Sequence, residues 1–325
     1  MKTKRLGNSD LKITRIGLGT WAIGGGGWKF GWGAQDDADS IKTIHEAIDA
    51  GINWIDTAAV YGFGHSEEVV GKAIEGMSER PIIATKCARK WDENGDILKV
   101  LKKDSIKKEC EASLQRLGLD VIDLYQIHWP EPDENIEEGW EAVAELIKEG
   151  KVRWGGVSNF SAEQMERVRP IHPISSLQPP YSMIVPNIEQ SQLPYCAEHN
   201  IGVIAYSPMY KGLLTGKLTR QRLAELPEND HRCRDPHLRE PELTINLELV
   251  GALQTIADRE NVSIMQLSIG WVLRRPEVTA AIAGARRPGQ IAEIAAAGEW
   301  EMPEAVSEEI DRLLKKRAEA LLKVN

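Results

Sequence analysis

Four residues whose side chains suit proton transfer lie at or just after the ends of apolar, strand-like runs. Asp56, Lys86 and His128 each end such a run, and Tyr61 follows the first run by five residues. In a parallel barrel the C-terminal ends of all strands open on one rim, where active sites lie. A carboxylate, a phenol, an amine and an imidazole would then meet there. That set suits proton donation to a carbonyl oxygen.

Length and composition favour one soluble globular unit. The chain has 325 residues, 42% of them hydrophobic and 27% charged. This length suggests about two domains of ordinary size, but α/β barrels of this length are routinely one unit. We therefore expect a single domain over residues 1–325.

The net charge and the cysteine pattern limit which partners the protein is expected to bind and the cellular compartment in which it is expected to lie. The net charge of −9 argues against a nucleic-acid or anionic-membrane surface, which would need a basic face. No run approaches the ~20 apolar residues of a membrane span, and the N-terminus does not resemble a signal peptide. The four cysteines form no CxxC pair, and no His-x-x-x-His is present. These features predict a reduced, cytoplasmic protein without a metal site.

Strand and helix patterns alternate through most of the chain. The expected strands are residues 16–19, 53–56, 82–86, 121–128, 152–158, 176–178, 202–206 and 278–283. The expected helices are residues 37–50, 66–75 with Ser66 as N-cap, 104–117, 136–149, 161–169 with Ser161 as cap, 187–199, 246–260, 263–274 and 288–297. Outside the repeat we expect a hairpin of residues 3–6 and 11–13, an irregular stretch over 207–241 and a C-terminal helix over 304–322.

Eight strand–helix units predict a (β/α)8 TIM barrel with an N-terminal β-hairpin and an extra C-terminal helix. The alternative is a doubly wound open sheet, because residues 17–22 match the G-x-G-x-x-G/A dinucleotide fingerprint after a strand. A glycine-rich, aromatic segment follows at the point where that fold requires a helix, which favours the barrel.

Six segments together carry a resemblance to a known family. They are residues 17–21 (GLGTW), 53–62 (NWIDTAAVYG), 155–160 (GGVSNF), 202–208 (GVIAYSP), 212–217 (GLLTGK) and 284–287 (GARR). In this order they make the chain resemble the aldo-keto reductases over nearly its whole length, and most closely their bacterial, potassium-channel-β-like branch. The resemblance implies a (β/α)8 barrel that binds a nicotinamide cofactor without a Rossmann fold, and an NAD(P)H-dependent carbonyl reductase.

The resemblance also assigns roles to the four rim residues. Tyr61 would be the general acid, and Lys86 would lower the pKa of its phenol because a neighbouring ammonium favours phenolate. Asp56 would hold Lys86, and His128 would orient the carbonyl. Singly, each residue has a structural alternative: a packing tyrosine, an Asx-turn aspartate, a surface lysine or a turn histidine.

Cofactor contacts are implied residue by residue. For the nicotinamide half the matching positions are Gly19, Thr20, Trp21, Asp56, Ser158, Asn159, Gln178 and Tyr206, the last as the stacking aromatic. For the pyrophosphate they are Ser207, Gly212, Leu213, Thr215 and Lys217, with an ordinary surface loop as the alternative. For the adenosine end they are Gly284, Arg286, Arg287, Gln290 and Glu293.

Cofactor choice and substrate are less constrained. Arg286 and Arg287 precede a helix expected from Pro288, and a helix start with guanidinium groups is a good phosphate site. The resemblance implies that the 2′-phosphate lies here, which favours NADP(H); the alternative is two arginines that only cover the surface. Gly289 and Ile294 depart from the family pattern and leave NAD(H) open. The aromatics expected at the substrate pocket are Trp21, Trp28, Phe30, Trp32, Trp91 and Trp129, although loop packing is an equal alternative. The substrate would be a small aldehyde, ketone or sugar carbonyl.

The polar stretch with His231, Arg232, Arg234, His237 and Arg239 is expected to be a solvated loop, with contact to an anionic substrate as the alternative. Two other functions remain open. One is a cofactor-binding regulatory or interaction protein of the channel-β-subunit type, and the other is an unrelated barrel enzyme that binds no nicotinamide. The oligomeric state is not readable from the sequence.

Overall fold

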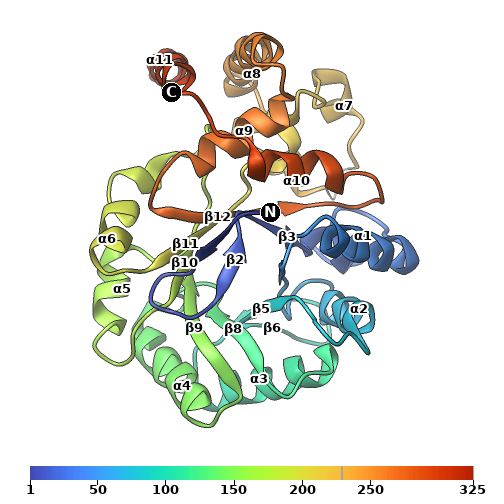
Figure 1. The fold of residues 1–325 in the computed structure, drawn as a ribbon, viewed down its shortest axis with the longest axis vertical. Coiled ribbons are helices and arrows are strands. Elements are labelled where there is room, and N and C mark those ends of the chain that lie inside the picture. Colours follow the sequence, from blue (N-terminus) through green and yellow to red (C-terminus); the bar gives the residue numbers. More distant parts are fainter. Residues whose placement is uncertain (228–229, 325) are drawn as a thin grey trace.

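A closed parallel barrel forms the centre of the molecule in the computed structural model, which describes residues 1–227 and 230–324 (Figure 1). Its strands, in order around the barrel, are β3 (Ile16–Gly19), β4 (Trp54–Asp56), β5 (Ile82–Cys87), β8 (Ile122–Ile127), β9 (Val152–Ser158), β10 (Ser176–Gln178), β11 (Gly202–Tyr206) and β12 (Val278–Gly284). β12 pairs in parallel with β3, which closes the barrel. The predicted (β/α)8 barrel is therefore confirmed, and the open sheet is excluded.

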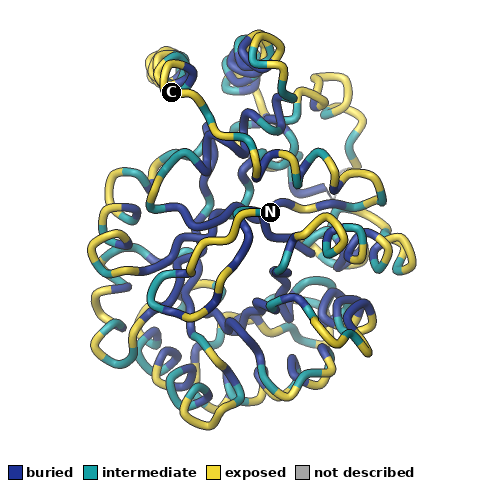
Figure 2. The backbone as a smooth tube through the Cα atoms, in the orientation of Figure 1, coloured by how far each residue is buried: buried dark blue, intermediate teal, exposed yellow. Residues whose placement is uncertain are grey.

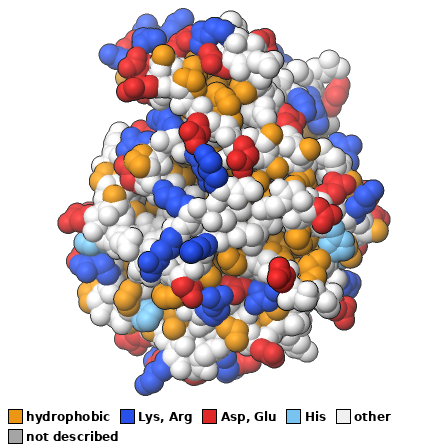
Figure 3. All heavy atoms as spheres, viewed as in Figure 1, with side chains coloured by type: hydrophobic (Ala, Val, Ile, Leu, Met, Phe, Trp, Pro, Cys, Tyr) orange, Lys and Arg blue, Asp and Glu red, His pale blue; other side chains and the backbone are white. Residues whose placement is uncertain are grey.

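Helices cover the outside of the barrel. They are α1 (Asp37–Asp49), α2 (His65–Ile74), α3 (Lys103–Leu117), α4 (Ile136–Lys148), α5 (Ala162–Val168), α6 (Gln192–Glu198), α8 (Glu242–Arg259), α9 (Ile264–Leu273) and α10 (Ile291–Glu299). Their exposed residues lie on the outer faces, while the strands are buried (Figure 2). Acidic and basic side chains are interspersed over the face seen in Figure 3. None of the helices described is long and apolar enough to cross a membrane.

The predicted additions at both ends of the chain are present. The hairpin of β1 (Thr3–Arg5) and β2 (Lys12–Thr14) lies across one end of the barrel, and Leu6, Leu11 and Ile13 pack there against barrel residues. α11 (Glu304–Leu321) packs beside α8. With one end covered by the hairpin, the site must open at the other end, where the strands terminate. The assignment of residues 1–325 to one domain stays a prediction.

Local differences from the sequence prediction occur mainly at helix starts. α2 begins at His65 after Gly64, so Ser66 is not its N-cap; the Ser66 hydroxyl instead donates to Thr20 Oγ1 at 2.8 Å. α10 begins at Ile291 and not at Pro288. The helix expected over 187–199 is split into η3 (Asn187–Glu189) and α6. The predicted Ser161 cap is confirmed as a capping box at the start of α5.

Two loops after barrel strands contain structure that the sequence did not predict. β6 (Arg89–Trp91) and β7 (Ile97–Lys99) form a hairpin directly after β5. The stretch expected to be irregular contains η4 (Tyr210–Thr215), α7 (Arg220–Ala224), η5 (His231–Arg234) and η6 (Pro236–Leu238). Residues 228–229 of that stretch lie outside the described residues. Both loops contribute to the site.

Candidate active site

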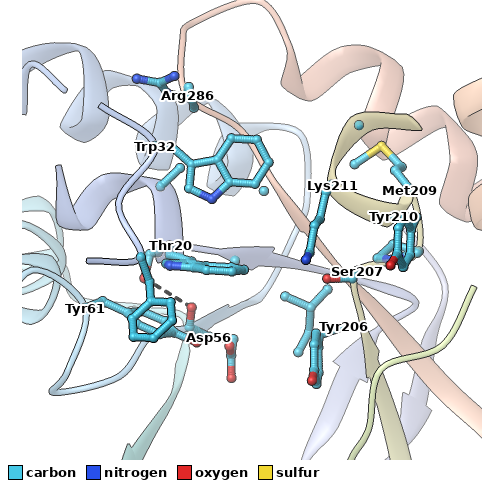
Figure 4. Close-up of a pocket in the computed structure, with 18 of the residues that line it drawn as sticks. Thr20, Trp32, Asp56, Tyr61, Tyr206, Ser207, Met209, Tyr210, Lys211 and Arg286 are labelled. Carbon is cyan, nitrogen blue, oxygen red and sulfur yellow. Dashed lines mark hydrogen bonds between the residues drawn. The ribbon is translucent and has the colours of Figure 1, made fainter. Parts of the chain in front are cut away.

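A cavity of about 1100 Å³ opens at the C-terminal ends of the barrel strands (Figure 4). Tyr61 and Asp56 lie on one side of it, and Lys211 and Ser207 on the other. The predicted site residues that line it are Gly19, Thr20, Trp21, Trp28, Phe30, Trp32, Asp56, Tyr61, His128, Trp129, Ser158, Asn159, Gln178, Tyr206, Ser207, Gly212, Thr215, Lys217, Gly284, Arg286, Gln290 and Glu293. The barrel thus brings together residues that are up to 270 or so positions apart in the chain.

The phenol and the amine meet at the base of this cavity. Lys86 Nζ donates hydrogen bonds to Asp56 Oδ2 at 2.7 Å and to the Thr57 carbonyl at 2.8 Å. It also donates to Tyr61 Oη at 3.4 Å, and it lies 5.1 Å from the centre of the Tyr61 ring. The Lys86 side chain is fully buried, so it does not itself line the cavity. Its charge acts from behind the cavity wall on Tyr61, which it contacts, and on His128, whose pKa it lowers.

His128 completes the group from the next strand. It follows β8, and its ring centre lies 5.8 Å from that of Tyr61. Its backbone N–H donates to the Cys87 carbonyl at 3.1 Å, and its own carbonyl accepts from Asn159 Nδ2 at 2.9 Å. The buried Nδ1 atom has no hydrogen-bond partner among the described residues. The backbone is thus fixed on both sides, and the imidazole faces the Tyr61 side of the cavity.

The expected lowering of the Tyr61 pKa is not found. Burial raises the pKa of Tyr61 well above its usual 10.0, and the negative charge of Asp56 raises it further. Burial lowers the pKa of Lys86, although Asp56 and Glu67 oppose that shift. Burial, followed by the charges of Lys86 and Arg89, holds the pKa of His128 well below 6.5. The site therefore holds a protonated phenol and a neutral imidazole at neutral pH.

A chain of polar side chains runs along the ends of β9, β10 and β11. Gln178 Nε2 donates to Asp56 Oδ1 at 2.8 Å, and Ser158 Oγ donates to the Gln178 carbonyl at 2.8 Å. Tyr206 Oη donates to Asn159 Oδ1 at 2.9 Å. The resemblance predicts that Ser158, Asn159 and Gln178 meet the carboxamide and that Tyr206 stacks on the nicotinamide ring. Amide and hydroxyl groups supply the donors and acceptors that such a group needs.

The opposite end of the cavity is basic. Five cationic side chains line it on the segments after β11 and β12: Lys211, Lys217, Arg222, Arg232 and Arg286. Gly212 has a positive φ of 91°, and a Cβ added there would meet nothing within 4 Å. Backbone can thus approach a ligand closely at this point. The size of the cavity, its amide group and its basic end fit a nicotinamide dinucleotide, with the phosphates at the basic end.

Besides Lys86, three predicted site residues do not line the cavity. Leu213 is fully buried in the core because η4 turns its side chain inward. Arg287 lies outside the cavity wall, whereas its neighbour Arg286 lies on it and donates to the Ala34 carbonyl. Trp91 packs on Phe63, with ring centres 5.6 Å apart, instead of facing the substrate space.

Sequence reasoning missed several cavity residues. Arg232 was expected to be solvated, but its guanidinium lies 4.7 Å from the centre of the Trp32 ring and lines the cavity. His231 beside it is buried, with its ring centre 5.2 Å from those of both Trp21 and Trp32. Lys211, Arg222, Arg89 and Lys99 were also missed. The basic composition of residues 231–239 was the one feature of the sequence that could have indicated the role of Arg232.

Comparisons with known proteins agree with this geometry. The model of the aldo/keto reductase family matches residues 15–315, and the chain belongs to that family. Aldo-keto reductase YhdN of Bacillus subtilis is 40% identical over 97% of this chain and 94% of its own length. The NADH-specific methylglyoxal reductase of Escherichia coli is 35% identical over 99% of both chains. The glycerol dehydrogenase AKR11B4 from Gluconobacter oxydans has a similar structure, with a TM-score of 0.89 and 39% identity over 97% and 96% of the two chains.

The branch of the family is also the expected one. A probable voltage-gated potassium channel subunit beta of Arabidopsis thaliana is 32% identical over 90% of both chains. The chain is therefore similar both to enzymes of oxidoreductase type and to a protein named as a channel subunit.

Proposed function

We propose that this protein is an NAD(P)H-dependent carbonyl reductase, which converts small aldehydes or ketones to alcohols in the cytoplasm. The observation that carries the proposal is the 3.4 Å contact between Tyr61 Oη and Lys86 Nζ at the base of a cavity that also holds His128. The names of the Escherichia coli and Gluconobacter oxydans relatives are those of enzymes that act on carbonyl or alcohol groups.

A reduced nicotinamide held by the cavity residues would supply a hydride to the carbonyl carbon. Tyr61 then acts on the carbonyl oxygen as a general acid, because its high pKa keeps the phenol protonated until the oxygen becomes basic. The Lys86 ammonium at 3.4 Å stabilises the phenolate left behind. Asp56 holds Lys86 in place, and His128, which is neutral, donates a hydrogen bond to the same oxygen. Carbonyl, hydride and proton together give the alcohol.

Replacing Tyr61 with phenylalanine tests this role. Loss of general acid catalysis typically costs 10²–10⁴-fold in rate, so we expect kcat/KM for an aldehyde to fall by about that factor. Cofactor affinity, measured by tryptophan fluorescence, should stay within about twofold. Tyr195→Phe is the matched control, since Tyr195 bonds Glu166 outside the cavity. Full turnover by Tyr61→Phe would remove Tyr61 from the mechanism.

We further propose that NADP(H) is preferred. Arg286 lines the basic end of the cavity, where burial lowers its pKa and the charges of Arg287 and Arg232 lower it further. A cluster of guanidinium groups suits a ribose phosphate. The relatives differ here, since one is named NADH-specific and another, from Schizosaccharomyces pombe, is named with NADP(+).

Fluorescence titration with NADPH and NADH tests the preference. We expect tighter binding of NADPH, and we expect Arg286→Met to weaken NADPH binding at least tenfold more than NADH binding. Equal affinities in the wild type, or equal losses in the variant, would contradict the preference.

The resemblance to a channel β subunit supports a second candidate, a cofactor-binding regulatory protein. That function predicts tight cofactor binding with negligible turnover of any carbonyl compound. A panel of aldehydes assayed by NADPH oxidation separates the two proposals.

A further inference from the structure

The substrate end of the cavity carries positive charge that a dinucleotide does not explain. Five lining cations lie on the segments after β11 and β12, at the end of the cavity that suits its phosphates. Three others, Lys29, Arg89 and Lys99, line the cavity from the loop after η1 (Trp21–Gly24) and from the β6–β7 hairpin. The wall between them contains aromatic side chains, among them Trp28 and Trp129. This second basic group lies on the loop of Trp28, whose ring centre is 6.1 Å from that of Tyr61, and on the hairpin that follows β5.

Arg89 is the buried member of this group. It follows Lys86 by three residues, past a turn at Ala88 whose φ is 70°. Only 8% of its surface is exposed, although the residue lines the cavity. Its guanidinium carbon lies 5.8 Å from the centre of the Trp129 ring, and Trp129 directly follows His128. Its charge acts on the imidazole of His128. Arg89 therefore lies beside the segment that carries His128 and lines the same cavity.

The acidic residues near Arg89 do not neutralise the group. A single oxygen, Glu131 Oε2, accepts from Arg89 Nη2 at 2.5 Å and from Lys99 Nζ at 3.1 Å. Glu109 is turned away from the cavity and accepts from the Ala88 N–H at 2.9 Å. Asp96 also lines the cavity and is exposed, as are Lys29 and Lys99, so solvent screens the charges of all three. The buried cation of the group, Arg89, shares its one close carboxylate, Glu131, with Lys99.

We propose, given the reductase function proposed above, that the preferred substrates are anionic carbonyl compounds: aldehydes or ketones with a carboxylate a few bonds from the carbonyl. Arg89 would bind the carboxylate, and Lys99 would reinforce it. A guanidinium binds carboxylate with paired hydrogen bonds, and a buried cation attracts an anion more strongly than one in water. The carbonyl would then lie between Tyr61 and His128, and the product would be a hydroxy acid with its carboxylate unchanged.

A purely structural role for Arg89 is the competing explanation. The residue joins the β6–β7 hairpin to Glu131, and its removal could loosen that loop without any effect on substrate choice. The two roles differ in one measurable respect. A structural role would lower turnover of charged and uncharged substrates alike, whereas recognition of a carboxylate would affect only the charged one.

Two substrates that differ by one charge provide the test: 4-formylbenzoate and its methyl ester. With the preferred cofactor, we expect kcat/KM for the acid to exceed that for the ester at least tenfold. Arg89→Met should lower the acid value 10- to 100-fold and the ester value less than threefold. Lys90→Met is the matched control, because Lys90 is the exposed neighbour on the same strand and does not line the cavity. It should leave the ratio unchanged.

A second variant and a binding assay cover the case in which Arg89→Met does not fold. Lys99→Met alters an exposed side chain and leaves the Arg89–Glu131 pair intact, and it should still lower the acid value about threefold or more at low salt. Quenching of tryptophan fluorescence by 4-(hydroxymethyl)benzoate should weaken in parallel.

Each alternative result has a distinct meaning. Equal turnover of acid and ester in the wild type, or equal losses in the variants, would overturn anion recognition while leaving the reductase function standing. Absence of turnover with both substrates and with uncharged aldehydes would overturn the reductase function and this inference with it.

Discussion

Replacing Asp56 with asparagine removes one charge of the buried Asp56–Lys86 pair and nearly keeps the shape of the side chain. Asp56 is 4% exposed and Lys86 is not exposed at all. Asp56 Oδ2 accepts from Lys86 Nζ at 2.7 Å, and Oδ1 accepts from Gln178 Nε2 at 2.8 Å. Both oxygens therefore face donors. An amide NH2 in either position meets a donor instead of an acceptor.

The free-energy cost can be bounded in two ways. Removing one partner of a buried ion pair typically costs about 3–5 kcal/mol of stability. The protein can limit this cost if Lys86 loses its proton. With an ordinary lysine pKa of about 10.4 and about 1.36 kcal/mol per pH unit, that loss costs about 5 kcal/mol at pH 7. We therefore expect a destabilisation of about 3–5 kcal/mol at pH 7.

The sign of the pH dependence follows from Lys86. Burial already lowers its pKa in the folded protein, and loss of Asp56 must lower it further. Between the lowered pKa and about 10.4, the unfolded state binds more protons than the folded state, so stability rises with pH. In Asp56→Asn this window extends to lower pH than in the wild type. At pH 9 the same arithmetic leaves a cost of about 2 kcal/mol.

Urea unfolding at pH 7 and pH 9, followed by both fluorescence and circular dichroism, measures the cost. Asp123→Asn is the matched control, because buried Asp123 pairs with Arg80 and Arg153, which do not lose protons in this range. Its cost should not change between the two pH values. A cost below about 1 kcal/mol for Asp56→Asn at pH 7, or one equally insensitive to pH, would refute a charged, paired Lys86.

Three further predictions concern stability and the turn that carries Tyr61. The pKa of His128 is held well below 6.5 in the folded protein, so below pH 6.5 the unfolded state binds more protons and stability falls as the pH falls. His128→Gln should remove this contribution to the loss of stability, which is at most about 1.4 kcal/mol per pH unit. Urea unfolding at pH 5 and pH 7 measures it. A Cβ at Gly24 would lie 2.8 Å from the Tyr61 carbonyl carbon, so Gly24→Ala should displace Tyr61 and lower kcat/KM at least tenfold. Unchanged kinetics would show that the backbone can move at this turn without displacing the Tyr61 side chain. Gly251→Ala in α8, where an added Cβ meets nothing within 4 Å, should leave kinetics unchanged and raise stability by about 1 kcal/mol in the same unfolding assay.

The sequence alone determined where the strands end, and this was enough to predict the barrel and much of its rim. Asp56 ends β4 and Lys86 lies in β5, as the apolar runs indicated. Those runs are legible because parallel strands are buried on both faces and read as continuous apolar segments. In a closed parallel barrel, residues that follow the C-terminal ends of the strands all lie at the same rim. The positions of the strand ends in the sequence were therefore enough to predict that these residues lie close together.

Only the tertiary structure decided the features that depend on burial and on loop paths. Trp91 and Trp129 both follow barrel strands, yet one packs on Phe63 and the other lines the cavity. Arg89 and Arg232 look like ordinary surface cations in the sequence, but the hairpin after β5 and the turns after β11 carry them into the cavity wall. The Tyr61 pKa rises because the phenol is buried and because the Asp56 charge lies close to it. Such balances depend on distances and solvent exclusion from many segments at once, and no local pattern of residues contains them.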